Sequence, residues 1–211
     1  MSDSATLNRR ARKMQHTAEQ LTAVTRRLTA ERGLAGFTIE EVCEEVDVSR
    51  RTFFNYFSTK EDAVIGADSD DEAQRFSDYY LGLGARGWHF VLDDLVSMIV
   101  TQFEQAGIDA QGHAQFLAAL EREPRLLVRF MGITRDRERQ AAAVVAQREG
   151  VPADDPRAEA AVSLLATLIR TSAERFLDPS NTKDFSTIMT DALAAFRSVL
   201  AEPSGTRKAQ P

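Results

Sequence analysis

The chain has 211 residues, 43% of them hydrophobic, which is enough for one or two domains with a buried core. No uncharged apolar stretch approaches the roughly 18 residues of a membrane-spanning helix, and the N-terminus lacks the apolar run of a secretory signal. We therefore expect a cytoplasmic protein with no membrane segment. Cys43 is the single cysteine, which excludes an intramolecular disulfide. Only 6 prolines and 11 glycines interrupt the chain, and this composition favours an all-α fold.

The net charge of −6 is unevenly distributed. Residues 1–64 carry ten basic and ten acidic side chains, so the acidic excess lies entirely in residues 65–211. Within the first part the basic residues form local groups, at Arg9 to Lys13 and at Arg50 and Arg51. A local basic face can bind phosphates even on an acidic protein, so the net charge does not exclude a nucleic-acid partner.

A longer helix followed by short helices is predicted in the first third of the chain. Apolar spacing over residues 21–28 predicts the first helix, and Gly33 allows it to end. Thr38–Glu41 has the pattern of a capping box, which starts a second helix. Ser49 is a good cap for a third helix. A second capping-box pattern, Ser58–Glu61, starts the next one.

The third predicted helix, residues 49–57, has two chemically different faces. Phe53 and Phe57 fall on one side at 100° per residue, which suits packing against a core. The other side carries polar residues: Arg51, Thr52, Asn55 and Tyr56. Arginine can bond guanine edges bidentately, and hydroxyl groups can reach phosphate oxygens. Preceded by a capped helix over residues 39–46 and a tight turn, this helix completes a predicted helix-turn-helix.

The segments Glu31–Val42 and Val48–Asp62 resemble the DNA-binding domain of TetR-family transcriptional regulators. The resemblance covers roughly residues 14–65. It implies that the third helix enters the major groove, with Arg50 and Arg51 as base readers. Further DNA contacts are expected from Thr38, Ser49, Thr52, Asn55, Tyr56 and Lys60, mostly to phosphates. The basic residues Arg9 to Lys13 are expected to lie along the DNA backbone or to reach into the minor groove, with a flexible tail as the alternative.

The turn of the motif departs from the family pattern. Family members usually have Ala where Cys43 and Val46 stand and Gly where Asp47 stands. Asp enters the left-handed region with modest strain, so we expect the turn to survive. Because Cys43 and Val46 are larger than alanine, we expect them to change the angle between the two helices. This angle determines the position of Arg50 and Arg51 at the DNA. Cys43 itself is interpreted as a buried hydrophobe, with a redox sensor as the alternative.

The remaining chain is predicted to be helical, with less specific signals. Helices are expected over about residues 89–104, 111–123, 124–149, 156–177 and 184–201. The predicted domains are a basic arm over 1–13, a DNA-binding domain over 14–65, a helical effector-binding and dimerisation domain over 66–202, and a disordered tail over 203–211.

The resemblance also implies a small ligand bound within the later helices. Candidate ligand contacts, for which ordinary core packing is the alternative, are Trp88, Phe103, His113, Phe116, Arg129 and Phe130. The apolar arc of residues 156–177 is wide enough for burial on two sides. Together with residues 184–201 it predicts a four-helix homodimer interface, with a monomer that has a larger core as the alternative. No histidine has partners at a metal-ligand spacing, so no metal site is predicted.

These patterns predict a homodimeric DNA-binding regulator. Its partners would be a palindromic double-stranded DNA operator and a small-molecule effector that releases it, with no cofactor. The expected form is a repressor. No nucleophile–base pair, phosphate loop or carboxylate pair suggests an enzyme. The alternative is a helical ligand-binding or scaffold protein that no longer binds DNA.

Overall fold

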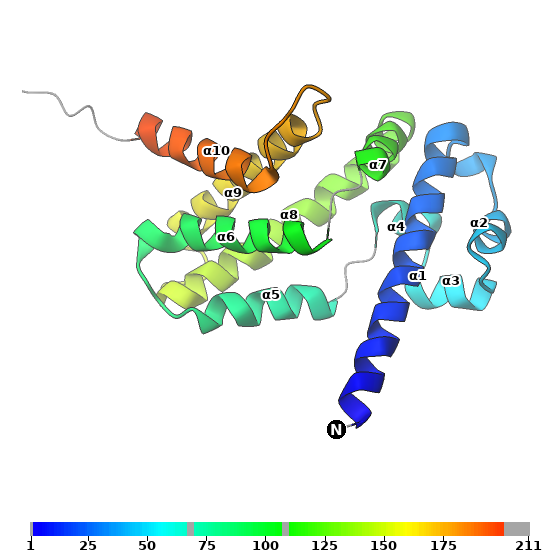
Figure 1. Ribbon diagram of the computed structural model, residues 1–211, viewed down its shortest axis with the longest axis horizontal. Helices are drawn as coiled ribbons and strands as arrows, with labels where there is room; N and C mark the ends of the chain where they lie inside the picture. Colours follow the sequence, from blue (N-terminus) through cyan, green and yellow to red (C-terminus); the bar gives the residue numbers. More distant parts are fainter. Residues whose placement is uncertain (1, 67–69, 107–109, 201–211) are drawn as a thin grey trace, which may run out of the picture. The chain divides into compact units, whose positions relative to one another are not determined.

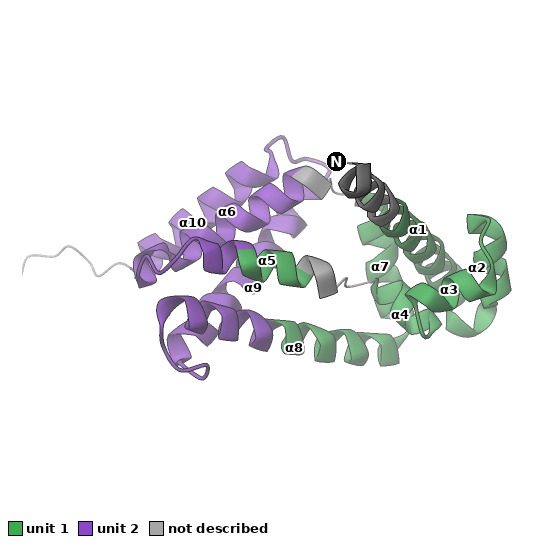
Figure 2. Ribbon diagram, turned by 90° about the horizontal axis from the view of Figure 1, so that it is seen from below, with its two compact units in different colours: residues 1–78, 109–137 green, residues 79–108, 138–211 purple. Residues whose placement is uncertain are grey.

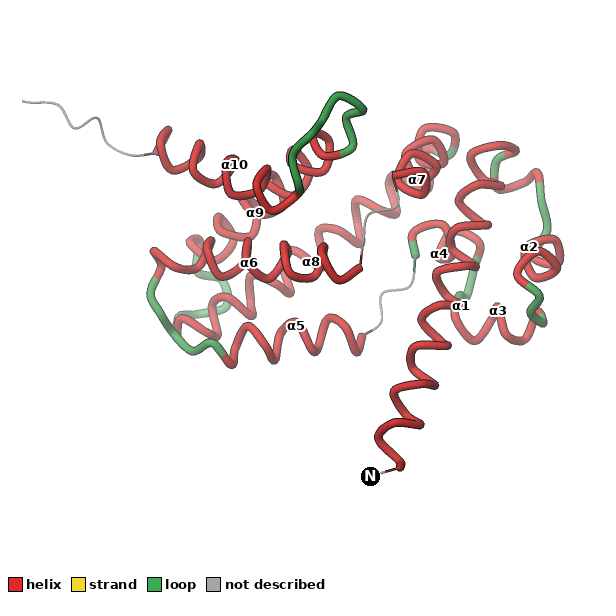
Figure 3. The backbone as a smooth tube through the Cα atoms, in the orientation of Figure 1, coloured by secondary structure: helices red, strands yellow, loops and turns green. Residues whose placement is uncertain are grey.

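The computed structural model describes residues 2–66, 70–106 and 110–200, and every regular element within these ranges is helical (Figure 1). Figure 3 shows the same described chain with helices and connecting loops but no strands. The predicted all-α class is confirmed. In chain order the elements are α1 (Ser2–Arg32), the 3-10 helix η1 (Leu34–Gly36), α2 (Ile39–Val46), α3 (Arg50–Tyr56), α4 (Lys60–Ile65), α5 (Asp70–Gly82), α6 (Trp88–Ala106), α7 (Ala110–Arg122), α8 (Pro124–Glu149), α9 (Pro156–Phe176) and α10 (Phe185–Leu200).

Most helices lie where the sequence predicts them, and α5 is a helix that the sequence patterns do not predict. The acidic stretch Asp68–Glu72 suggests a turn, whereas Asp70 is the first residue of α5. Carboxylates are favourable in the first turn of a helix because they face its positive dipole end, so an acidic stretch suits a helix start equally well. Similarly, α1 begins at Ser2 and runs through the predicted arm of residues 1–13. The predicted tail, residues 203–211, lies outside the described residues.

The chain forms two compact units, coloured separately in Figure 2. Unit 1 contains residues 1–78 and 109–137, and unit 2 contains residues 79–108 and 138–211. The divisions fall inside α5 and α8, so each of these helices contributes to both units. The predicted domain boundary at residue 65 stays a prediction. Unit 1 is larger than the predicted DNA-binding domain because it also includes α7 and the first half of α8.

One apolar cluster of unit 1 joins α1, α2 and α3. Leu21 and Leu28 of α1 pack in it with Val42 of α2 and with the two inward phenylalanines, Phe53 and Phe57. All five side chains are buried. Burying a side chain of this size contributes about 1.5 to 3 kcal/mol, so this cluster is what holds α3 in place.

A second apolar cluster of unit 1 fixes α4. Val64 and Ile65 at the end of α4 pack with Leu120 of α7 and Leu126 of α8. Arg26 of α1 adds two hydrogen bonds, from Nε to the Val64 carbonyl at 2.8 Å and from Nη2 to the Ile65 carbonyl at 2.9 Å. These carbonyls have no partner within the helix because they lie in its last turn. Helix α4 is therefore held from both α1 and α7.

The connection after α1 is tied to α7 and α8 as well. The carboxylate of Glu123, between α7 and α8, accepts a hydrogen bond from the Leu34 backbone N–H at 2.7 Å. Gly33, the residue before Leu34, has a backbone φ angle of 74°, a value that residues with a Cβ rarely adopt. A Cβ at Gly33 would lie 2.9 Å from the Glu123 carboxylate. The corner therefore requires glycine for its backbone angle, whereas the Glu123 side chain could shift to admit a Cβ.

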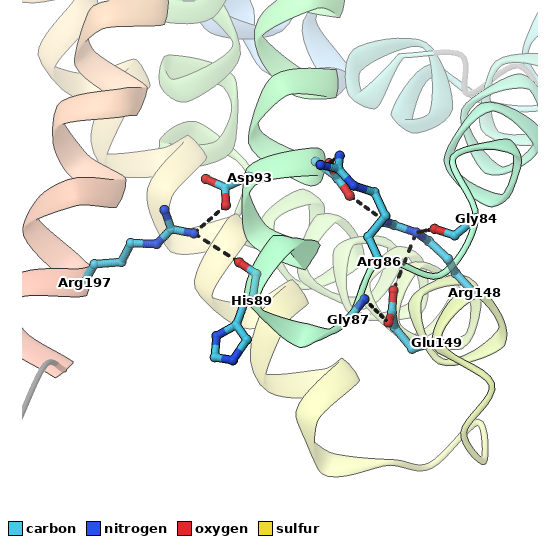
Figure 4. Close-up of polar contacts among 9 residues, drawn as sticks. Gly84, Arg86, Gly87, His89, Asp93, Arg148, Glu149 and Arg197 are labelled. Atoms are coloured by element: carbon cyan, nitrogen blue, oxygen red, sulfur yellow. Dashed lines mark hydrogen bonds and ion pairs between the residues drawn. The ribbon is translucent and has the colours of Figure 1, made fainter.

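Unit 2 contains a buried ion pair near the end of α8. The Arg148 guanidinium pairs with the carboxylate of Asp94 on α6 and donates from Nε to the Gly84 carbonyl at 2.7 Å (Figure 4). It also lies over the Tyr80 ring, 4.3 Å from the centroid. The half-exposed Arg86 completes the group by donating to the other oxygen of Asp94 at 2.7 Å. This cluster connects the α5–α6 loop and α6 to α8.

The wide apolar arc of α9 is largely covered within the subunit. Leu165 and Leu168 are buried, and α9 packs against both α6 and α10. On the neighbouring stripe, Phe176 packs edge-on against Phe103 and Phe185, which stack on each other with ring centroids 3.5 Å apart. Much of the arc that predicts a dimer is therefore explained by packing inside one chain.

Two other kinds of feature are absent from the described residues. No helix in them combines the length and apolar character needed to cross a membrane. The same residues bring together no group of three or more His, Cys, Asp or Glu side chains that could hold a metal ion.

Candidate nucleic-acid interface

Helix α2 starts with the predicted capping box. The Thr38 hydroxyl accepts a hydrogen bond from the Glu41 N–H at 3.2 Å, and the Glu41 carboxylate accepts one from the Thr38 N–H at 2.9 Å. Two backbone donors that a helix start leaves unpaired are thus satisfied. Thr38 is exposed, so its hydroxyl lies at the surface of the motif.

The turn between α2 and α3 passes through Asp47, which has φ 57 and ψ 49. This is the left-handed conformation expected at that position. Cys43, one turn earlier, is 4% exposed in the apolar cluster of α1 to α3. Burial raises the pKa of its thiol, as does the charge of Glu40, so little reactive thiolate forms. These properties fit the interpretation of Cys43 as a buried hydrophobe.

Helix α3 presents the polar face that the sequence predicts. The Ser49 hydroxyl caps the helix by accepting from the Thr52 N–H at 3.0 Å. Of the eight predicted DNA contacts, five are exposed: Thr38, Ser49, Arg50, Arg51 and Asn55. The other three are half-buried: Thr52, Tyr56 and Lys60. The motif thus brings the predicted residues to one part of unit 1, and their individual roles stay predictions.

Arg50 is held by two neighbours at the start of α3. Its Nη1 atom lies 2.7 Å from a carboxylate oxygen of Glu40 on α2. Its guanidinium also lies above the ring of Phe54, 5.9 Å from the centroid. Glu40 is a residue that the sequence does not single out, because no local pattern relates a residue of one helix to a residue beyond the next turn.

Lys60 makes contacts within the protein that the sequence did not predict. Its ammonium donates to the Leu34 carbonyl and, at 2.8 Å, to the Phe37 carbonyl, and it lies 4.5 Å from the centroid of the Phe37 ring. Lys60 therefore ties the start of α4 to the connection before α2. The cap of α4 is Thr59 rather than Ser58. The capping pattern fits either register, since an acidic residue follows each of them by three positions.

The predicted ligand contacts fall in both units. Trp88 and Phe103 belong to unit 2, and the other four, His113, Phe116, Arg129 and Phe130, belong to unit 1. The contacts that the structure describes for these residues are with other side chains of the same chain. Phe116 and Phe130 meet edge-to-face at 5.1 Å, Arg129 pairs with Asp62 of α4, and Arg157 lies over the Trp88 ring at 4.4 Å. A ligand role for these residues stays a prediction. A DNA role for Arg9 to Lys13 also stays a prediction, because most of their side chains lie outside the part of the chain whose side chains are described.

Comparisons with known proteins agree with this motif. The model for "Bacterial regulatory proteins, tetR family" matches residues 21–64, and the model for "MftR C-terminal domain" matches residues 92–201, more than half of the chain. The chain is 30% identical to the HTH-type transcriptional regulator TcmR of Streptomyces glaucescens over 149 residues. This alignment covers 69% of the chain and 66% of that relative, just under two thirds of its length. With a helix-turn-helix of the expected geometry in the first matched segment, the chain belongs to the TetR family of bacterial regulatory proteins.

Proposed function

We propose that the protein is a transcriptional regulator that binds double-stranded DNA as a homodimer. The observation that carries this proposal is the exposed polar face of α3, which includes Arg51 and Asn55 and is fixed from behind by buried Phe53 and Phe57. A helix of this kind fits the major groove, where arginine distinguishes guanine from other bases. A regulator that reads genomic DNA would act in the bacterial cytoplasm.

The finer proposal is a repressor of a palindromic operator. Two identical recognition helices related by a two-fold axis read an inverted repeat, with half-sites about one helical turn apart or a little more. The outward faces of α9 and α10 carry exposed small side chains, among them Ala160, Ser163, Ala194 and Ser198, and small side chains allow helices to pack closely. These faces are our candidates for the dimer interface.

Release by a small-molecule effector completes the proposal. Most of the predicted ligand contacts are aromatic, so we expect an apolar or amphipathic compound. A typical coupling free energy of about 1 to 3 kcal/mol would weaken operator binding roughly 5- to 150-fold. A screen that monitors thermal stability and operator dissociation in parallel tests this part. If no compound changes either quantity, the effector part of the proposal is wrong.

The experiment that tests DNA reading begins with selection of bound fragments from genomic DNA. Footprinting of the selected site should show two symmetric half-sites. Arg50→Ala should then cost about 1 to 3 kcal/mol on the operator and much less on random duplex, because it removes a base contact rather than a phosphate contact. Absence of any preferred sequence, with no effect of Arg50→Ala, would favour a helical scaffold that no longer binds DNA.

A further inference from the structure

We propose that Glu40 is a positioning residue for DNA reading: it holds the Arg50 guanidinium in the orientation that reads a base. This inference rests on the proposed function, because it gives Glu40 a part in the specificity of the same interface. Glu40 belongs to α2 and Arg50 to α3, so the ion pair crosses the turn of the motif.

The ion pair, whose Arg50 and Glu40 side chains are 61% and 53% exposed, leaves the base-reading edge of Arg50 available. Glu40 approaches Nη1 at 2.7 Å, and no described residue bonds Nε or Nη2. A guanidinium has five N–H donors in a rigid plane, and a guanine edge needs only two parallel ones. A carboxylate that competed with the base would occupy the two parallel N–H donors that the guanine edge requires. Glu40 instead binds at one end of the plane and leaves the Nε–Nη2 edge unoccupied.

A second contact restricts the plane of the same guanidinium. Phe54 is 47% exposed, unlike its buried neighbour Phe53, and its ring lies below Arg50. The Phe54 ring is itself fixed, because it packs edge-on against Phe53 with centroids 5.5 Å apart. Arg50 is therefore held at one end by a carboxylate and on one face by an aromatic ring.

The next residue provides an internal comparison. Arg51 is exposed on the same helix and makes no ion pair with a described residue. A long side chain that is free in solution loses rotamer entropy when it binds, and a preorganised one loses less. Arg50 is preorganised by Glu40, so it should supply more sequence discrimination than Arg51.

The acids of α2 differ in a way that separates charge from positioning. Glu41 is occupied by the capping box, and Glu40 reaches Arg50. Glu44 lines the same open groove between α2 and α3 as Glu40 and Arg50, but it makes no ion pair with a described residue. Removing either Glu40 or Glu44 deletes one negative charge near the DNA, and only Glu40 also positions Arg50. Glu44 is therefore the matched control.

The test compares full-length Glu40→Ala, Glu44→Ala and Arg50→Ala. Binding is measured on the selected operator, on operators with each base pair substituted, and on random duplex, after circular dichroism confirms that each variant is folded. Both glutamate variants should bind random duplex somewhat more tightly, because they repel phosphates less. Arg50→Ala should abolish discrimination at one base pair per half-site, where a bidentate contact supplies roughly 5- to 150-fold. Glu40→Ala should reduce discrimination at that same base pair about threefold, since the ion pair is exposed, and Glu44→Ala should leave it unchanged.

Three results would overturn the inference. If Glu40→Ala behaves like Glu44→Ala, Glu40 is only a nearby charge. If Glu40→Ala increases discrimination, Glu40 competes with the base. If Arg50→Ala leaves discrimination intact while the wild type has a preferred operator, Arg50 is not the reader and Glu40 cannot position one. In all three cases the wild-type protein still selects an operator, whereas failure of the proposed function would appear as a wild type without sequence preference.

Discussion

Asp47 shows how a single residue decides the geometry of the motif. Its left-handed backbone redirects the chain so that α3 follows α2 after two further residues. Every L-residue with a Cβ is strained in this conformation, and Asp less than most. The position therefore tolerates the departure from the glycine that family members usually have.

We expect Asp47→Gly to be more stable than Asp47→Ala by about 1 kcal/mol, because both variants lose the carboxylate and only alanine keeps a Cβ in the left-handed region. Glu44 is the control, because it lies in the regular part of α2, where alanine should be more stable than glycine by about 1 kcal/mol. Urea denaturation of the four variants measures both differences. The same order at both positions would contradict the role given to Asp47.

Lys60 should have two measurable effects, of which the sequence predicts only one. Lys60→Ala removes two hydrogen bonds from a charged donor, so the free energy of unfolding should fall by about 1.5 to 3 kcal/mol. If Lys60 also contacts phosphate, all DNA sequences should bind more weakly and the salt slope should fall by about one per contact. Exposed Arg51→Ala is the control for stability and should change it by less than about 0.5 kcal/mol. Unchanged stability of Lys60→Ala would contradict the structural role.

At the scale of elements, the buried pair in unit 2 is where a charge change matters most. The Arg148 side chain is fully buried and that of Asp94 is 8% exposed. Removing one partner leaves the other charge buried without compensation, which typically costs about 3 to 5 kcal/mol. Replacing both by apolar residues costs less only if no other buried charge depends on them, so Glu149, whose 4% exposed carboxylate lies 3.6 Å from the Arg148 Nε, must be neutralised as Gln in the comparison.

In a Glu149→Gln background we therefore expect Asp94→Leu to destabilise the protein by about 3 kcal/mol or more, and Asp94→Leu combined with Arg148→Met to be more stable than Asp94→Leu alone. Urea unfolding of the two single variants and the double variant measures this coupling. The exposed pair Arg170–Glu174 is the control, with a coupling expected below about 1 kcal/mol. Additive effects of Asp94 and Arg148 would show that the pair is not coupled.

What the sequence predicts correctly is governed by interactions between near neighbours. The capping box of α2 and the left-handed Asp47 depend on residues within one or two turns, so their patterns can be read directly. The bond between Glu123 and the Leu34 N–H joins residues 89 positions apart, and the Glu40–Arg50 pair crosses a turn. Such contacts depend on how helices pack, and periodicity within one helix carries no information about them.

At the scale of the whole molecule, dimer formation would determine how strongly the protein holds its operator. In a dimer, binding of one recognition helix to its half-site brings the second helix close to the other half-site. The second contact then forms at a high effective concentration, which separate subunits do not have. Much of the apolar surface of α9 is used within the subunit, so the proposed interface consists of the small exposed residues of α9 and α10.

Ala194→Arg should therefore give a monomer at micromolar concentration and weaken operator binding by a large factor, because a long charged side chain prevents close helix packing. Ala114→Arg is the matched control, since Ala114 is also exposed but belongs to α7. Analytical ultracentrifugation and operator titration of both variants test the expectation. A dimeric Ala194→Arg variant with unchanged operator affinity would exclude this part of α10 from the interface.

The packing of α4 sets a rule for constructing chimeric regulators. A graft that takes only residues 1–66 follows the extent of the sequence motif, but it would leave Val64 and Ile65 without the partners that α7 and α8 provide. The Leu34 N–H would also lose its acceptor, Glu123. A transplantable DNA-reading module must therefore carry residues 109–137 along with residues 1–78, so it consists of two pieces of chain separated by residues of unit 2.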